Sequence, residues 1–136
     1  MDFFPVYLKL TDASCLVVGG GKIAERKIDL LRRAGARVTV VSPTLIPTLR
    51  IAQNEGQITH QATLFSVDAL EGHSLVIAAT NEENINRQVA LAAKQRNIPV
   101  NVVDRPDLCS FIIPSIVDRS PVIIAISTGG ASPILA

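Results

Sequence analysis

The sequence has few aromatic residues, few cysteines and almost no net charge. Aromatic side chains make up 4% of the 136 residues, whereas apolar residues as a whole make up 48%. The core must therefore consist mainly of Val, Ile, Leu and Ala, a composition that suits a parallel sheet covered by helices on both faces. The length suffices for one domain, and the apolar content excludes a disordered chain.

Long apolar runs and fields of one charge are also missing. The net charge is +1, so we expect no nucleic acid partner and no binding to an acidic membrane. Runs such as residues 75–79 and 122–126 fall far short of the roughly 20 residues that cross a bilayer. The first five residues carry no basic n-region and no long apolar segment, so we expect no secretory signal there. We therefore expect a cytoplasmic protein.

The cysteines and histidines give no metal-binding pattern. Cys15 and Cys109 form neither a C-x-x-C motif nor a metal-ligand spacing, which predicts two reduced, buried thiols. His60 and His73 have no acidic or cysteine partner at ligand spacing, so we expect both at the surface and predict no metal site.

Short apolar runs alternate with amphipathic segments over the first hundred residues. This alternation predicts an α/β fold with a Rossmann-like, doubly wound parallel sheet. Thr80, with Glu83 three residues later, predicts a capping box at the start of one helix. The predicted strands are residues 14–18, 37–41, 57–61, 75–79 and 100–103, and the first predicted helix has Ile23, Ala24, Ile28 and Leu31 on its core face.

The rhythm changes after residue 104. Two apolar runs, residues 111–117 and 122–127, are separated by a polar turn and show no helical period. We expect an appended C-terminal antiparallel pair, either beside the parallel sheet or pairing with another subunit. Ser132-Pro133 then predicts a helix start near the end of the chain, which suggests a piece of a longer product.

Three glycines lie between the first predicted strand and the first predicted helix. Gly19, Gly21 and Ala24 fit the pattern G-x-G-x-x-A in the context that dinucleotide binding requires. Gly19 permits a tight turn, Gly21 lets the backbone approach a diphosphate, and Ala24 lets helix and strand pack closely. The helix N-terminus then faces the phosphates. A tight strand-to-helix turn without a ligand is the alternative.

The end of the second predicted strand departs from this fingerprint. An acidic residue is expected there to hold the ribose, but the sequence has Ser42, Pro43 and Thr44. Neutral hydroxyl groups can bind ribose without repelling a 2′-phosphate, so this site does not decide between NAD and NADP. Lys22 and Arg26 either assist a phosphate or form a solvated helix surface.

Asp104 follows the last predicted parallel strand. Ligands of doubly wound sheets bind beyond the carboxyl ends of the strands, where Thr80 and Asn81 end the neighbouring strand. A carboxylate there can serve as a general base, although the residues alone favour an ordinary turn aspartate. The glycine-rich residues 127–130 fit either an anion site or a plain loop.

Several segments together resemble one family. VVGGGKIAERK, GARVTVVSP, IAATN, NVVD, SFIIPSIVDRSP and STGGASPILA occur in order, and they resemble the N-terminal domain of siroheme synthase and its stand-alone relative, precorrin-2 dehydrogenase/sirohydrochlorin ferrochelatase. The resemblance implies NAD-dependent oxidation of precorrin-2 to sirohydrochlorin, followed in many members by insertion of Fe²⁺. It also implies a homodimer.

The resemblance assigns roles to individual positions. Asp104 matches the aspartate that is important for both steps, and Thr128 matches a serine that is phosphorylated in some members. The resemblance implies an NAD-binding domain over residues 1–110 and the start of a dimerisation region over residues 111–136. The expected cofactor-binding residues are Gly19, Gly21, Lys22, Ile23, Ala24, Ser42, Pro43, Thr44, Thr80 and Asn81.

Two other functions stay open at this point. A regulatory domain that binds NAD(H) without catalysis would share the glycine motif but give Asp104 no role. A different Rossmann oxidoreductase would normally need a separate substrate domain, for which the chain has no room. The sequence does not tell whether a methyltransferase domain follows, whether chelation is retained, or which metal is preferred.

Overall fold

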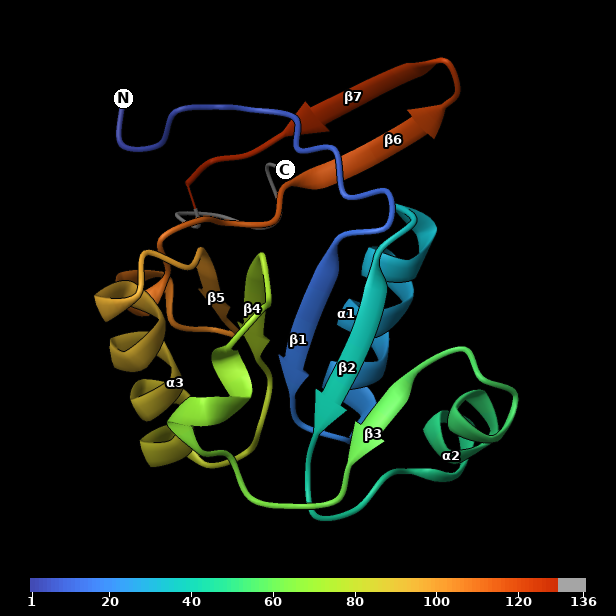
Figure 1. Cartoon of the computed structure of the whole chain (residues 1–136). Helices are drawn as coiled ribbons and strands as arrows, with labels where there is room; N and C mark the ends of the chain where they lie inside the picture. Colours follow the sequence, from blue (N-terminus) through green and yellow to red (C-terminus); the bar gives the residue numbers. More distant parts are fainter. Residues whose placement is uncertain (130–136) are drawn as a thin grey trace.

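Five parallel strands form the centre of the molecule (Figure 1). The computed structural model describes residues 1–129. The strand order is β3-β2-β1-β4-β5, and each neighbouring pair is parallel. This order confirms the predicted Rossmann-like sheet. The strands are β1 (Ser14–Val18), β2 (Arg37–Val41), β3 (Thr59–Gln61), β4 (Leu75–Ala78) and β5 (Val100–Val102).

Helices cover both faces of this sheet (Figure 1). Side chains of α1 and α2 join one apolar cluster, whereas side chains of α3 and the short helix η1 join a second cluster on the opposite face. The sheet is therefore doubly wound. The helices are α1 (Lys22–Arg33), α2 (Pro47–Asn54) and α3 (Glu83–Gln95), and the 3₁₀ turns are η1 (Val67–Leu70) and η2 (Pro106–Leu108).

The central strand β1 shows why its sequence is apolar throughout. Cys15 and Val17 belong to the cluster beneath α1 and α2, whereas Leu16 and Val18 belong to the cluster beneath α3. All four side chains are at most 2% exposed. Because successive side chains of a strand point to opposite faces, a strand between two helical layers needs apolar residues at every position.

Helix α1 differs from its prediction at its first turn. Ala24, Ile28 and Leu31 are buried as expected, but Ile23 is 40% exposed. The core-face prediction for Ile23 was wrong, because this residue lines a cavity at the carboxyl end of the sheet; its position there agrees with its second prediction, as a cofactor-binding residue. The helix ends before Gly35, whose φ of +85° favours glycine.

Helix α3 begins without the predicted capping box. Its N-cap residue is Glu82, and no side chain caps it. The hydroxyl of Thr80 accepts a hydrogen bond from the backbone N–H of Glu82 at 3.1 Å and donates to Oδ1 of Asn86 at 2.7 Å. The hydroxyl of Thr80 is thus used to join Asn86 and Glu82, and it organises the loop before the helix instead of capping the helix.

The chain order creates a crevice at the carboxyl end of the sheet. From β1 the chain passes through α1 to β2 and β3, and it then crosses to β4 on the other side of β1. The loops after β1 and β4 therefore leave the sheet in opposite directions. Such a switch point is the usual ligand site of doubly wound folds.

A separate hairpin completes the described part of the chain. Strands β6 (Ser115–Arg119) and β7 (Val122–Ile126) pair antiparallel, which confirms the predicted appended segment. In Figure 1 the arrowheads of β1 and β2 point away from this hairpin, so it lies at the amino end of the parallel sheet, beside the N-terminal segment. Ser132-Pro133 lies outside the described residues.

Within residues 1–129, no helix has the length and apolar character that crossing a membrane requires. The helices α1, α2 and α3 are amphipathic, and each buries one face against the sheet or its edge.

Candidate active site

A cavity of about 590 Å³ opens at the carboxyl ends of β1, β2 and β4. Four stretches of chain form its wall: the glycine loop, the loop after β2, residues 63–65 and the loop after β4. The structure thus brings together nine of the ten predicted cofactor-binding residues. They are Gly19, Gly21, Lys22, Ile23, Ser42, Pro43, Thr44, Thr80 and Asn81.

Gly19 allows the loops after β1 and β4 to touch. Its φ is +132°, and a Cβ atom there would overlap the backbone carbonyl of Ala79. Its N–H donates to the carbonyl oxygen of Val41 at 3.0 Å. A side chain at this position would therefore force the two loops apart.

Gly20 and Gly21 serve different needs. A Cβ atom on Gly20 would overlap the carbonyl oxygen of Thr44, so Gly20 is required by the protein itself. A Cβ atom on Gly21 would meet no protein atom within 4 Å. The sequence prediction missed Gly20, although the run of three glycines was the available signal.

The N-terminus of α1 faces the cavity beside Gly21. Gly21 is the N-cap residue, and no side chain caps the helix. The first backbone N–H groups of a helix lack partners within the helix, and the helix dipole adds a partial positive charge there. The bare backbone and the open space beside Gly21 fit a diphosphate group.

Ala24 lies beneath this loop and does not line the cavity. It is fully buried within the cluster that α1 forms with the sheet. Its small side chain fits the packing role of the third position in the glycine motif.

The loop after β2 is held by an internal hydrogen-bond network. Ser42 is 5% exposed, and its hydroxyl donates to the carbonyl oxygen of Thr44 at 2.7 Å. Nε2 of His60 donates to the carbonyl oxygen of Ser42 at 2.8 Å. The surface prediction for His60 was wrong, because this half-buried ring holds the loop in place. Pro43 and Thr44 remain exposed beside the cavity.

The cavity wall carries little charge. Among the described residues that line it, the charged ones are Lys22 and Glu82. The Lys22 side chain is 76% exposed, and its Nζ lies 3.7 Å from Glu25. The wall at the end of β2 is thus neutral, and it supplies neither a carboxylate for ribose nor a cation for a 2′-phosphate.

Asp104 lies at the same edge of the sheet but outside this cavity wall. In the register of β4 and β5, Ala78 pairs with Val102, so Thr80 and Asp104 both lie two residues beyond a paired position. Asp104 is exposed, and its φ is +61°. Aspartate tolerates this left-handed conformation better than most residues.

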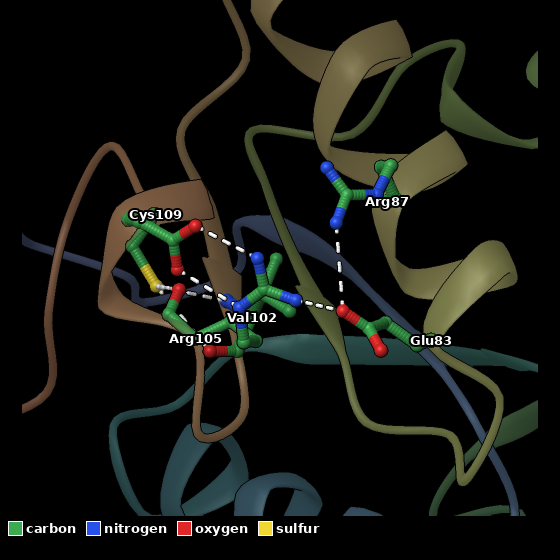
Figure 2. Close-up of polar contacts among 6 residues, drawn as sticks. Glu83, Arg87, Val102, Arg105 and Cys109 are labelled. Carbon is green, nitrogen blue, oxygen red and sulfur yellow. Dashed lines mark hydrogen bonds and ion pairs between the residues drawn. The ribbon is translucent and has the colours of Figure 1, made fainter.

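The residues after Asp104 form a network of ion pairs (Figure 2). Arg105 binds Asp107 through two nitrogen atoms at 2.8 and 2.9 Å, and it also pairs with Glu83 at the start of α3. Glu83 lies 3.4 Å from Arg87 on the same helix. The hydrogen bonds from Arg105 hold the pKa of the Asp107 carboxyl below its ordinary value. The turn is thereby tied to α3.

Cys109 closes the same turn from inside (Figure 2). Its sulfur accepts a hydrogen bond from the N–H of Val102 at 3.1 Å and lies 3.3 Å from the carbonyl oxygen of Arg105. Burial raises the pKa of this thiol. Cys15 is fully buried as predicted, but Cys109 is only half-buried, because its turn lies at the molecular surface.

His73 differs from its prediction as well. It precedes β4, and its Nδ1 is buried without a hydrogen-bond partner within the described residues. Burial lowers the pKa of this ring. In residues 1–129, the His, Cys, Asp and Glu side chains form no group that could hold a metal ion.

A glycine-rich turn at the switch point of a doubly wound sheet, with an uncapped helix behind it, defines the dinucleotide-binding class of proteins. Comparison with known families agrees with this geometry. The pattern of the putative NAD(P)-binding family matches residues 6–115, and the chain belongs to this family. The cofactor prediction is thereby confirmed as a nicotinamide dinucleotide.

Curated relatives confirm the resemblance to siroheme synthase. The chain is 57% identical to the siroheme synthase of Methylobacillus flagellatus and 54% identical to that of Thioalkalivibrio sulfidiphilus, over its whole length in both cases. It spans 29% and 28% of these two relatives.

A solved structure agrees with the fold. The chain matches SirC, a precorrin-2 dehydrogenase, with a TM-score of 0.85 and 32% sequence identity. The match covers 98% of this chain and 65% of SirC.

Proposed function

We propose that this chain carries out the NAD-dependent oxidation of precorrin-2 to sirohydrochlorin, a step of siroheme biosynthesis. The similarity to SirC and to siroheme synthases supports this reaction. The structural observation that carries the proposal is the placement of Asp104 at the same sheet edge as the dinucleotide cavity. A regulatory NAD(H)-binding domain would not need an exposed carboxylate at this edge.

Three groups of cavity residues hold three parts of the cofactor. The glycine loop and the N-terminus of α1 hold the diphosphate, and Pro43 and Thr44 contact the adenosine half. Thr80 and Asn81, at the end of β4, contact the nicotinamide half. The bound nicotinamide supplies a hydride acceptor.

Asp104 provides the base. Oxidation of precorrin-2 removes a hydride and a proton, and the carboxylate of Asp104 takes the proton. Its position outside the cavity wall suits a large substrate, because the cofactor fills the cavity and the macrocycle must lie across its mouth. Asp104 is exposed toward solvent, so a tetrapyrrole can reach it.

Insertion of Fe²⁺ into sirohydrochlorin is the second proposed activity. The metal ion is a substrate in this step, and Asp104 assists loss of the pyrrole protons. A chelatase must release its metal to the macrocycle, so it has no use for a tight cage of soft ligands.

The test is anaerobic incubation with precorrin-2 and NAD⁺, with NADH formation followed by absorbance. We expect Asp104→Asn to lower kcat by about a hundredfold or more, the range for loss of a general base, with NADH affinity unchanged. Asp68→Asn is the matched control, because it removes an exposed carboxylate on η1 that lies outside the cavity wall and outside the network around Arg105. Undiminished turnover in Asp104→Asn would exclude the proposed base, and NADH binding by a wild-type protein without turnover would favour the regulatory alternative.

We also propose that the hairpin belongs to a homodimer interface, with residues 1–110 as the NAD-binding domain and residues 111–136 as the start of a dimerisation region. The hairpin register places Val117 opposite Ile124, and both are more than 40% exposed. An exposed apolar surface of this kind suits a protein partner. A second copy of this chain is the proposed occupant.

A further inference from the structure

Asn86 is a buried polar residue on the core side of α3. It is 7% exposed, and the next helical residues on that side include Val89 and Ala90, which are fully or almost fully buried. Burial of a carboxamide is costly unless its oxygen and nitrogen find hydrogen-bond partners. The sequence analysis assigned no role to this residue.

In the described part of the chain, every hydrogen bond of the Asn86 side chain goes to Thr80, a residue of the cavity wall. Its Oδ1 accepts from the hydroxyl of Thr80 at 2.7 Å and from the backbone N–H of Thr80 at 3.2 Å. Its Nδ2 donates to the backbone carbonyl of Thr80 at 3.1 Å. The carboxamide therefore fixes both the backbone and the side chain of Thr80.

The glycine loop contacts Ala79, the residue before Thr80, from the other side. The carbonyl of Ala79 packs directly against Gly19, where no Cβ atom would fit. The N–H of Ala79 donates to the carbonyl oxygen of Val18 at 2.8 Å. The residues at the end of β4 are thus held between Gly19 and Asn86.

We propose that Asn86 is a positioning residue for the dinucleotide: it sets the width of the crevice between the glycine loop and the loop after β4. The nicotinamide half contacts Thr80 and Asn81 in the proposed function, and the inference rests on that placement. Without Asn86, the Thr80 backbone loses both bonds to the carboxamide and its hydroxyl keeps only its bonds to Glu82, so this wall of the crevice is held less firmly.

The test measures NADH affinity rather than turnover. We expect Asn86→Ala to raise the Kd for NADH about tenfold or more at 15 °C. Thr80→Val removes the hydrogen bond from the hydroxyl to Asn86 together with the hydroxyl's bonds to Glu82, and it should raise Kd by about threefold, a loss of about 0.7 kcal/mol. Because both changes act on one network, the loss of binding free energy in the double variant should be smaller than the sum of the two single losses.

Asn84→Ala is the matched control. Asn84 is exposed on the same helix, so the Kd of this variant for NADH should stay within twofold of wild type. A thermal melt of each variant shows that binding is measured on folded protein. An Asn86→Ala protein that melts earlier but binds NADH with wild-type affinity would overturn the proposal, because Asn86 would then be a merely structural residue.

Asn86→Asp keeps the proposal testable if the alanine variant does not fold. The carboxylate retains an acceptor for the hydroxyl and N–H of Thr80 but loses the donor to its carbonyl. We expect weak NAD⁺ binding at pH 8 that recovers toward wild type at pH 5.5, where a protonated carboxyl group again donates. Binding equal to wild type at both pH values would overturn the proposal. Failure of the proposed reaction would appear separately, as NADH binding without precorrin-2 oxidation.

Discussion

Apolar residues are buried in the strands that lead to the carboxyl end of the parallel sheet but exposed in the hairpin at its amino end. At the carboxyl end, loops are held by specific hydrogen bonds around a cavity, and the strands that lead to it are buried on both faces. At the amino end, the hairpin is equally rich in Val and Ile, yet its large apolar side chains are 41–58% exposed. The exposure of the apolar side chains differs because helices cover both faces of the sheet, whereas no described helix or strand covers the hairpin.

This comparison separates two kinds of stability. The sheet and its helices bury their apolar residues within one chain, and the described wall of the cavity comes from that same chain. The hairpin has paired backbones but exposed apolar side chains, and an isolated two-stranded hairpin is marginally stable in water. The proposed second copy would cover this apolar face and so stabilise the hairpin.

The largest expected effect comes from the glycine loop at the carboxyl end. Gly19→Ala places a methyl group against the Ala79 carbonyl at a φ that disfavours alanine, so we expect a loss of about 3 kcal/mol or more in the free energy of unfolding. Gly21→Ala meets no protein atom, so its melting temperature should stay near wild type while NADH affinity falls about tenfold or more. Thermal melts and NADH titrations distinguish the two glycines; normal NADH binding by Gly21→Ala would remove this residue from the cofactor site.

The next effect concerns the amino end. Ile124→Asp puts a charge on the apolar face of the hairpin, and we expect it to weaken self-association by about a hundredfold, as for a central apolar contact. NADH affinity should change less than twofold. Ile51→Asp is the matched control, since Ile51 is a similarly exposed isoleucine on α2. Sedimentation at several protein concentrations measures both, and equal association of wild type and Ile124→Asp would refute the proposed interface.

The smallest effect tests how firmly the turn after Asp104 is closed. Because burial raises the pKa of Cys109, less thiolate is present at pH 8 than for a free cysteine, and iodoacetamide should modify it several-fold more slowly. Cys15, whose pKa is also raised by burial, should stay unmodified until the protein unfolds. Mass spectrometry over time gives both rates. Modification of Cys109 at the rate of a free thiol would show that its sulfur does not close the turn.

Local sequence patterns predicted the sheet and three of the four stretches that form the cavity wall, but not residues 63–65. The apolar runs gave the parallel strands, and the glycine motif between a strand and a helix gave the switch-point loop. Such patterns predict the structure correctly where a single strand, helix or loop determines which residue types are needed. Ile23 was misplaced because helical periodicity does not tell where the sheet beneath a helix ends.

Contacts between distant elements escaped the sequence analysis. Gly20 is required by Thr44, His60 holds the loop at Ser42, and Cys109 bonds to the backbone of Val102. Asn86 was missed for a related reason, since its binding to Thr80 replaced a capping box that the local spacing had favoured. Each case depends on where the chain returns in space, which a linear pattern does not record.

The stretch that follows the turn after Asp104 connects the carboxyl end of the sheet to the hairpin at its amino end. Ser110 donates its backbone N–H to the carbonyl of Val100 at 2.8 Å, and its hydroxyl accepts from the N–H of Val100. The chain thus runs back along the last strand and enters the hairpin within a few residues. In the proposed homodimer, the subunit contact would therefore lie on the same continuous stretch of chain as Asp104, the proposed base, and assembly would restrict the motion of that stretch.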